Sequence, residues 1–191
     1  MSVFEVNSIV AEPGEKVFGH LPVETMADGS LIKLPLIILN GSKIGPKMSI
    51  NSGCHGDEFE GIYAIMRLAN ELDPKNMAGT VIFVPQFNPP SCAAGTRESP
   101  IDGNNLARVG VGKPDGSITA RIAHVFNEHI VTKIDYFIDL HSAGRNEALV
   151  PYVGFRRYPD KKLRERSREL AEAFGTEFIY VTEPDQKERG L

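Results

Sequence analysis

The chain has 191 residues, a formal net charge of −4 and a hydrophobic content of 41%. This length suits one domain with its own core, so we expect a single domain over residues 1–191 that opens with a short β-rich lead-in over residues 1–30. The acidic charge balance gives no reason to expect nucleic acid or an anionic membrane as a partner. No apolar stretch approaches the ~18 residues of a membrane span, and the spacing of the two cysteines indicates reduced thiols and a cytoplasmic protein.

Segments with strand and helix patterns alternate along the chain. Apolar runs of strand length predict strands over residues 17–23, 31–39, 48–52, 80–85, 136–141, 149–154 and 177–181. Apolar residues at helical spacing predict helices over residues 58–72, 117–132 and 160–174. Strands that alternate with helices predict an α/β fold, in which a mostly parallel or mixed twisted sheet is flanked by helices.

Several side chains have a predicted place in these elements. Asp57 is expected to cap the first helix, and Pro35 places the strand over residues 31–39 at a sheet edge or at an irregular start. Gly175 is expected to end the third helix. The apolar side chains expected to face the core are Ile62, Ile65, Met66, Ala69 and Leu72 in the first helix and Leu163, Leu170, Ala171 and Phe174 in the third.

Residues 86–116 contain no periodic segment. They are rich in asparagine, proline, glycine and arginine. A connection of this length inside a compact domain is uncommon, and it is usually either functional or disordered. The mixture of arginine and asparagine with turn-forming residues favours a binding loop.

The junction after the strand over residues 48–52 carries the strongest chemical signal. It lies at the carboxyl end of a strand, where open α/β sheets bind their ligands. His55 and Glu58 are three residues apart, and both offer good ligand atoms for zinc. Gly56 lies between them and is expected to let the backbone bend, so that both side chains can aim at one point.

A third ligand is expected from His141, which ends the strand over residues 136–141. Three protein ligands with an open fourth position are the arrangement of catalytic zinc. The candidate metal ligands are therefore His55, Glu58 and His141. Hydrogen-bonded packing roles are expected for the remaining histidines, His20, His124 and His129.

Other side chains near these positions have more than one interpretation. Arg97 and Arg108 in the long loop can grip a carboxylate or stabilise an oxyanion, or they can be solvated surface arginines. Asp139 shares a strand face with His141, and it is expected either to orient that ligand or to cap neighbouring backbone. Cys54 is expected to pack as a small apolar group.

Several short motifs occur in one order between residues 48 and 154. They are Gly-Cys-His-Gly-Asp-Glu-Phe-Glu-Gly at residues 53–61, Asn-Pro at 88–89, Gly-Thr-Arg at 95–97, Asp-Gly-Asn-Asn-Leu-Ala-Arg at 102–108 and Asp-Leu-His-Ser at 139–142. As an ordered set they resemble the succinylglutamate desuccinylase/aspartoacylase family of the zinc carboxypeptidase superfamily. Residues 97–103, 141–144 and 150–152 look most like the N-acetyl-diaminobutyrate deacetylase branch, whose members act in ectoine breakdown.

This resemblance implies a zinc carboxypeptidase-like fold with one zinc ion, held by His55, Glu58 and His141. It implies that Arg97 polarises the scissile carbonyl, and that Arg108 and Asn105 help to bind the substrate. The implied reaction is hydrolysis of the amide bond of a small N-acyl amino acid by zinc-activated water. The whole chain would then be one zinc-hydrolase domain.

Two departures from the family pattern bear on activity. The family has Asn-Leu-Asn-Arg where this chain has Asn-Leu-Ala-Arg at residues 105–108, and Ala107 cannot hydrogen-bond a substrate carboxylate. The general-base glutamate of the family lies on a later strand and maps onto no residue of this chain, so we expect the N-terminal, metal-binding portion of a longer enzyme. Loss of that base would slow hydrolysis by about 10²–10⁴-fold, and an uncovered sheet would favour self-association.

Other functions stay open at this point. A metallocarboxypeptidase would cleave C-terminal residues from peptides with the same zinc ligands. A non-catalytic zinc- or ligand-binding domain is favoured by Ala107 and by the unassigned base. A cysteine hydrolase that uses Cys54 would have to remain active in the presence of a strong chelator.

Overall fold

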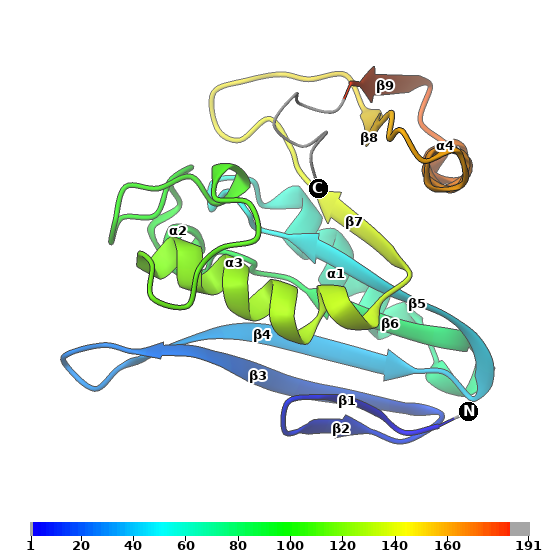
Figure 1. Cartoon of the computed structure of the whole chain (residues 1–191), viewed down its shortest axis with the longest axis horizontal. Coiled ribbons are helices and arrows are strands. Elements are labelled where there is room, and N and C mark those ends of the chain that lie inside the picture. The colour runs from blue at the N-terminus through cyan, green and yellow to red at the C-terminus, as the bar shows by residue number, and fades with distance from the viewer. Residues whose placement is uncertain (1, 184–191) are drawn as a thin grey trace. The chain divides into compact units, whose positions relative to one another are not determined.

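The computed structural model describes residues 2–183 (Figure 1). The chain divides into two compact units, residues 1–147 and residues 148–191. The single domain expected over residues 1–191 stays a prediction. Within the described range, no helix is long and apolar enough to cross a membrane.

A five-stranded mixed sheet forms the centre of the first unit (Figure 1). Its strands lie in the order β3 (Glu15–Thr25), β4 (Leu31–Asn40), β6 (Ala78–Val84), β5 (Lys43–Ser52) and β7 (Tyr136–Leu140). The pairs β3–β4 and β4–β6 are antiparallel, whereas β6–β5 and β5–β7 are parallel. The prediction of a mostly parallel or mixed sheet flanked by helices is confirmed, and the arrangement is the mixed one.

Two helices cover the opposite faces of this sheet, α1 (Glu60–Glu71) on one and α3 (Ile118–His129) on the other (Figure 1). Successive side chains of a strand point to opposite faces. Ile38 of β4 therefore packs in the same core as Phe126 of α3, whereas its neighbour Ile37 packs in the same core as Ile65 of α1. The sheet is held by two apolar layers, so its strand ends are well fixed.

The first 30 residues form three strands, two of them short. β1 (Phe4–Val6) and β2 (Ile9–Ala11) pair antiparallel as a hairpin, and β3 follows as an outer strand of the main sheet. The apolar side chains of β1 and β2 belong to the same core as Phe126. The hairpin of β1 and β2 is thus packed on the α3 side of the sheet.

Pro35 lies in β4, which has a neighbour on each side, so the prediction of an edge strand is wrong for the strand as a whole. However, β6 pairs only with residues 37–40 of β4. At Pro35 the sole paired residue is His20 of β3. The missing N–H of the proline therefore removes no hydrogen bond on the β6 side.

Two expectations for α1 are wrong. Asp57 does not cap the helix, because the N-cap residue is Phe59, which makes no side-chain cap hydrogen bond. Met66 is 41% exposed, since the buried stripe of the helix is narrow. That buried stripe consists of Gly61, Ile65 and Ala69.

The long connection over residues 86–116 contains one short helix, α2 (Pro89–Ala94), and one 3-10 turn at Leu106–Arg108. Two prolines open α2, where their fixed φ and missing N–H suit the first helical turn. The sequence pattern missed α2 because a helix of six residues is too short to show helical periodicity.

Residues 148–183, the described part of the second unit, form a two-stranded parallel sheet and one helix: β8 (Tyr152–Arg156), α4 (Lys161–Phe174) and β9 (Phe178–Thr182). Gly175 ends α4 in a left-handed conformation with φ of +81°, as predicted. Leu163 and Phe174 were expected to face inward, but they are 45% and 46% exposed. A sheet of two strands is too narrow to cover them.

Candidate metal centre

Strand pairing brings two distant parts of the sequence together at one edge of the sheet. β5 and β7 are parallel neighbours, and Ser52 at the end of β5 pairs with Leu140 at the end of β7. The loop that carries His55 follows β5, and His141 follows β7. Because the carboxyl ends of parallel strands meet at the same edge, these two histidines lie close together.

The loop after β5 is held in place by backbone contacts with the long connection. It bends at Gly53, whose φ is +68°, and the Gly56 N–H donates to the Thr96 carbonyl oxygen at 2.8 Å. Gly56 lies in a turn between His55 and Glu58, and it has a role beyond the predicted bend. A Cβ there would lie 1.9 Å from the backbone oxygen of Ser91 in α2, so glycine at this position allows the close approach of α2.

The carboxylate of Glu58 lies between two imidazoles. Its Oε1 is 2.8 Å from His55 Nδ1, and its Oε2 is 2.8 Å from His141 Nδ1. The ring centroids of the two histidines are 4.9 Å apart. One ligand atom from each of the three side chains lies within 4.8 Å of the others. The structure thus brings together the three residues predicted from the sequence as metal ligands.

Each histidine of this group is also held at its other ring nitrogen. His55 Nε2 lies 3.1 Å from Asn105 Oδ1, and His141 Nε2 lies 3.0 Å from Asp139 Oδ2. Such contacts fix the orientation of a metal-binding imidazole. The prediction that Asn105 helps to bind the substrate stays a prediction. In the structure its side-chain oxygen faces His55 and also accepts from the Ala107 N–H at 3.0 Å.

The protonation states of these groups reflect their neighbours. Burial by itself would raise the pKa of Glu58, but hydrogen bonds from His141 and His55 outweigh it and hold that pKa well below its usual range. Hydrogen bonds to Asp139 and to Glu58 raise the pKa of His141 to about 10. Two carboxylates therefore flank one imidazole, and this arrangement attracts positive charge.

The two arginines of the long connection lie in different surroundings. Arg97 Nη1 donates to Glu58 Oε1 at 3.1 Å, although 56% of its side chain is exposed. Arg108 ends the 3-10 turn, and its side chain is exposed. The structure therefore places Arg97 against the candidate ligands and Arg108 in solvent, three residues after Asn105.

One contact of this centre was not expected from the sequence. The backbone N–H of Ser142 donates to Glu58 Oε2 at 3.0 Å. No sequence signal could reveal it, because every residue except proline carries that N–H.

Cys54 belongs to a second group of metal-ligating side chains, together with Asp139 and His141. Its burial, together with the charges of Asp139 and Glu58, raises the pKa of its thiol, so the thiol keeps its proton at neutral pH.

The chemistry of the ligand set His55, Glu58 and His141 fits zinc. Two imidazole nitrogens and one carboxylate are a common set of protein ligands for a catalytic zinc ion. The buried carboxylate of Glu58 is ionised, and both imidazoles turn their Nδ1 atoms toward it. Among the described residues, the only other such group of metal-ligating side chains shares His141 with this one.

The fold of the chain resembles that of metallo-carboxypeptidases. A solved metallo-carboxypeptidase from Burkholderia cenocepacia superposes with a TM-score of 0.64 at 18% identity, over 90% of this chain and 50% of that chain. At this identity the likeness concerns the fold alone. The predicted carboxypeptidase-like fold is confirmed.

Within this class the family is defined by sequence. The model of the succinylglutamate desuccinylase/aspartoacylase catalytic domain matches residues 44–189. The chain therefore belongs to the succinylglutamate desuccinylase/aspartoacylase family, as its motifs predicted.

Two relatives are especially similar to the chain. The N-alpha-acetyl-L-2,4-diaminobutyric acid deacetylase of Halomonas elongata is 39% identical over 150 residues, which are 78% of this chain and 44% of that protein. The product-bound structure of the ectoine utilization protein EutE (DoeB) from Ruegeria pomeroyi superposes with a TM-score of 0.85 at 29% identity, over 96% of this chain and 56% of that chain. The chain thus spans about half the length of these relatives.

Proposed function

We propose that this chain carries the metal-binding part of a zinc-dependent hydrolase that cleaves the amide bond of a small N-acyl amino acid. The convergence of His55, Glu58 and His141 in a member of this family is the observation that supports it most. The similarity to a deacetylase of an acetylated diaminobutyric acid supports an N-acetyl-diaminobutyrate-like substrate. The proposal includes a cytoplasmic location, which the free thiols of Cys54 and Cys92 support.

In this proposal His55, Glu58 and His141 hold the zinc ion. When bound, zinc supplies a Lewis acid and lowers the pKa of a water molecule to about 7. Asn105 and Asp139 keep the two imidazoles in the orientation that presents Nδ1 to the ion. The general base is assigned to none of the described residues.

The two arginines would act on the substrate. Arg97 would stabilise the negative charge that develops on the carbonyl oxygen. More than half of its side chain is exposed, at 56%, so it can turn from Glu58 toward a substrate while losing little buried contact. Arg108 would hold the substrate carboxylate with its two-pronged guanidinium. Ala107 has no polar side chain and adds no hydrogen bond to the substrate carboxylate.

Zinc content tests the ligand assignment directly. We expect about one zinc ion per purified chain by elemental mass spectrometry, because three protein ligands with an open position bind zinc tightly. His141→Ala should lose the ion. His124→Ala is the matched control, since His124 lies in α3, where it pairs with Glu128 at 3.1 Å, and it should keep the ion. A wild-type chain without zinc, or loss in both variants, would contradict the proposal.

A substrate panel tests the reaction. We expect slow release of acetate from N-acetyl-diaminobutyrate or a similar N-acyl amino acid, loss of that activity with a chelator and recovery on addition of zinc. Arg97→Ala should lower the rate by about 10²–10³-fold, as loss of an oxyanion donor does, and Arg67→Ala on the exposed face of α1 should not. Cleavage of short peptides instead would indicate a metallocarboxypeptidase. Bound zinc without any hydrolysis would indicate a non-catalytic binding domain.

A further inference from the structure

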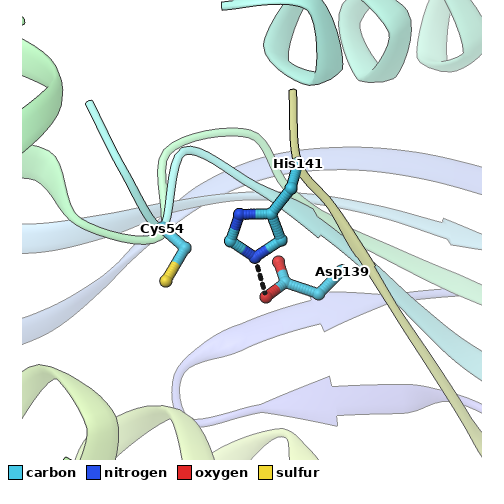
Figure 2. Close-up of side chains that lie close together, drawn as sticks. All are labelled: Cys54, Asp139 and His141. Atoms are coloured by element: carbon cyan, nitrogen blue, oxygen red, sulfur yellow. Dashed lines mark hydrogen bonds and ion pairs between the residues drawn. The ribbon is translucent and has the colours of Figure 1, made fainter. Parts of the chain in front are cut away.

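Cys54, Asp139 and His141 form a second group of metal-ligating side chains, shown in Figure 2. One ligand atom from each lies within 4.8 Å of the others. Cys54 comes from the loop after β5, whereas Asp139 and His141 come from β7 and its end. In Figure 2 the ring of His141 lies between the other two side chains and is joined to Asp139 by a hydrogen bond.

The two ring nitrogens of His141 face different groups. Nδ1 of His141 lies 2.8 Å from Glu58 Oε2, while Nε2 lies 3.0 Å from Asp139 Oδ2. The two ring nitrogens of one histidine thus point to different carboxylates. Each nitrogen can therefore belong to a different set of metal ligands.

An unpartnered polar atom lies within the second group. Asp139 Oδ1 is buried and has no hydrogen-bond partner within the described part of the chain. A buried acceptor without a partner is unfavourable, and its lone pairs are available to a cation. Cys54 is only 2% exposed, so its sulfur is shielded from water.

We propose that Cys54, Asp139 and His141 bind a soft divalent cation such as Cd²⁺ through the sulfur, a carboxylate oxygen and Nε2. A thiolate ligand selects soft ions, whereas the nitrogen and oxygen donors of His55, Glu58 and His141 suit zinc. This assignment rests on the placement of the three side chains and does not require the proposed hydrolysis.

Binding at this group is an exchange of ligands. The ion forms bonds to sulfur, oxygen and nitrogen, and the Cys54 thiol and the Nε2 of His141 each release a proton to solvent. No electron is transferred. An imidazole can bind ions at both nitrogens only as an imidazolate, so occupation of one ligand set weakens binding at the other.

Cadmium titration of the metal-free full chain tests this assignment. The readout is the ultraviolet charge-transfer absorbance of a thiolate–cadmium bond. We expect the band in the wild-type chain and its loss in Cys54→Ser, with cadmium affinity lower by at least about tenfold. Cys92→Ser is the matched control, because the Cys92 sulfur donates to the Gly53 carbonyl oxygen and lies outside the group. It should keep the band.

Glu58→Gln separates the two ligand sets. It removes the charged zinc ligand and leaves the second group intact, so the cadmium band should persist even if zinc content and hydrolysis are lost. Loss of the band in a folded Glu58→Gln chain would overturn the proposal, because Cys54 would then bind the ion together with the proposed zinc ligands. A wild-type chain without the band, or a band lost in Cys92→Ser, would also overturn it. Circular dichroism monitors folding, and Cys54→Ala replaces Cys54→Ser if the buried hydroxyl unfolds the chain.

Discussion

The two compact units of the chain differ in how much apolar surface they bury. In the first unit Phe83 of β6 is fully buried, and apolar cores lie on both faces of the sheet. In the second unit Ala171 is the one buried hydrophobic residue within the described range. Four successive residues of β9, Phe178, Ile179, Tyr180 and Val181, are between 38% and 61% exposed.

This difference teaches where the candidate metal centre obtains its rigidity. Two-stranded sheets are marginally stable by themselves, whereas wider sheets covered by helices are not. His55, Glu58 and His141 all belong to the first unit, and they follow two neighbouring strands of its five-stranded sheet. We therefore expect substitutions in the first unit to be severe and matched substitutions in the second unit to be mild.

The largest expected effect is that of Phe83→Ala. Phe83 packs with Ile37 and Ile65 on the α1 side of the sheet, and removal of a buried phenylalanine ring costs about 3–5 kcal/mol. Its matched partner is Phe178→Ala in β9, which is 50% exposed and should change stability by no more than about 0.5 kcal/mol. Denaturant unfolding measures the free energy of unfolding of both variants. Equal losses would contradict the expected difference between the two units.

Gly56→Ala comes next. The new methyl group would meet the backbone of Ser91, 1.9 Å away, and overpacking of this kind costs about 1–3 kcal/mol. The zinc content should fall as well, because the loop between His55 and Glu58 has to move. Gly154→Ala in β8 is the matched change, with its nearest contact at 3.7 Å. A Gly56→Ala chain with unchanged melting temperature and zinc content would refute the close-approach role of Gly56.

Asp102→Asn tests the anchor of the long connection. Asp102 accepts from the N–H and the hydroxyl of Thr119 and from the Asn104 N–H, and loss of its charge should destabilise the chain by about 1–2 kcal/mol. Asp160→Asn in the second unit, which loses the carboxylate at the α4 N-terminus, should cost less. Chemical unfolding at neutral pH gives both values.

The effect of Asp102 should depend on pH. Burial by itself would raise the pKa of Asp102, but its hydrogen bonds with Thr119 and Asn104 outweigh burial and lower that pKa. Because the folded-state pKa lies below the unfolded value of about 3.9, the stabilisation is present above that pH and is lost as the pH falls through the folded-state pKa. The gap between wild-type and Asp102→Asn stability should therefore close in acid. A gap that is constant with pH would assign the effect to packing.

The smallest effect on stability is expected from Ile179→Lys. Ile179 in β9 is 40% exposed, so the change in free energy of unfolding should stay within about 0.5 kcal/mol. Exposed apolar strands promote association, and a lysine opposes it. If the chain self-associates, size-exclusion chromatography should show less association for Ile179→Lys. Ile44→Lys, at a singly exposed position in the first unit, should leave the profile unchanged.

Much of the fold could be predicted from the sequence because its signals are local. Apolar periodicity located the long strands and helices, and Gly175 marked the end of α4. The spacing of His55 and Glu58, with His141 at a strand end, indicated the three side chains that the structure brings together. Periodicity failed where packing decides exposure, as at Met66, since the pattern shows a face of a helix and not what covers it.

The sequence by itself determined the element types and the candidate metal ligands, because strand and helix periods and ligand chemistry depend on residue type and spacing. Only the tertiary structure decided that Asn105 faces His55, that Gly56 allows the close approach of α2 and that the Ser142 N–H donates to Glu58. These contacts join segments 35 to 84 residues apart. They follow from the parallel register of β5 with β7 and from loop hydrogen bonds, which local residue patterns do not encode.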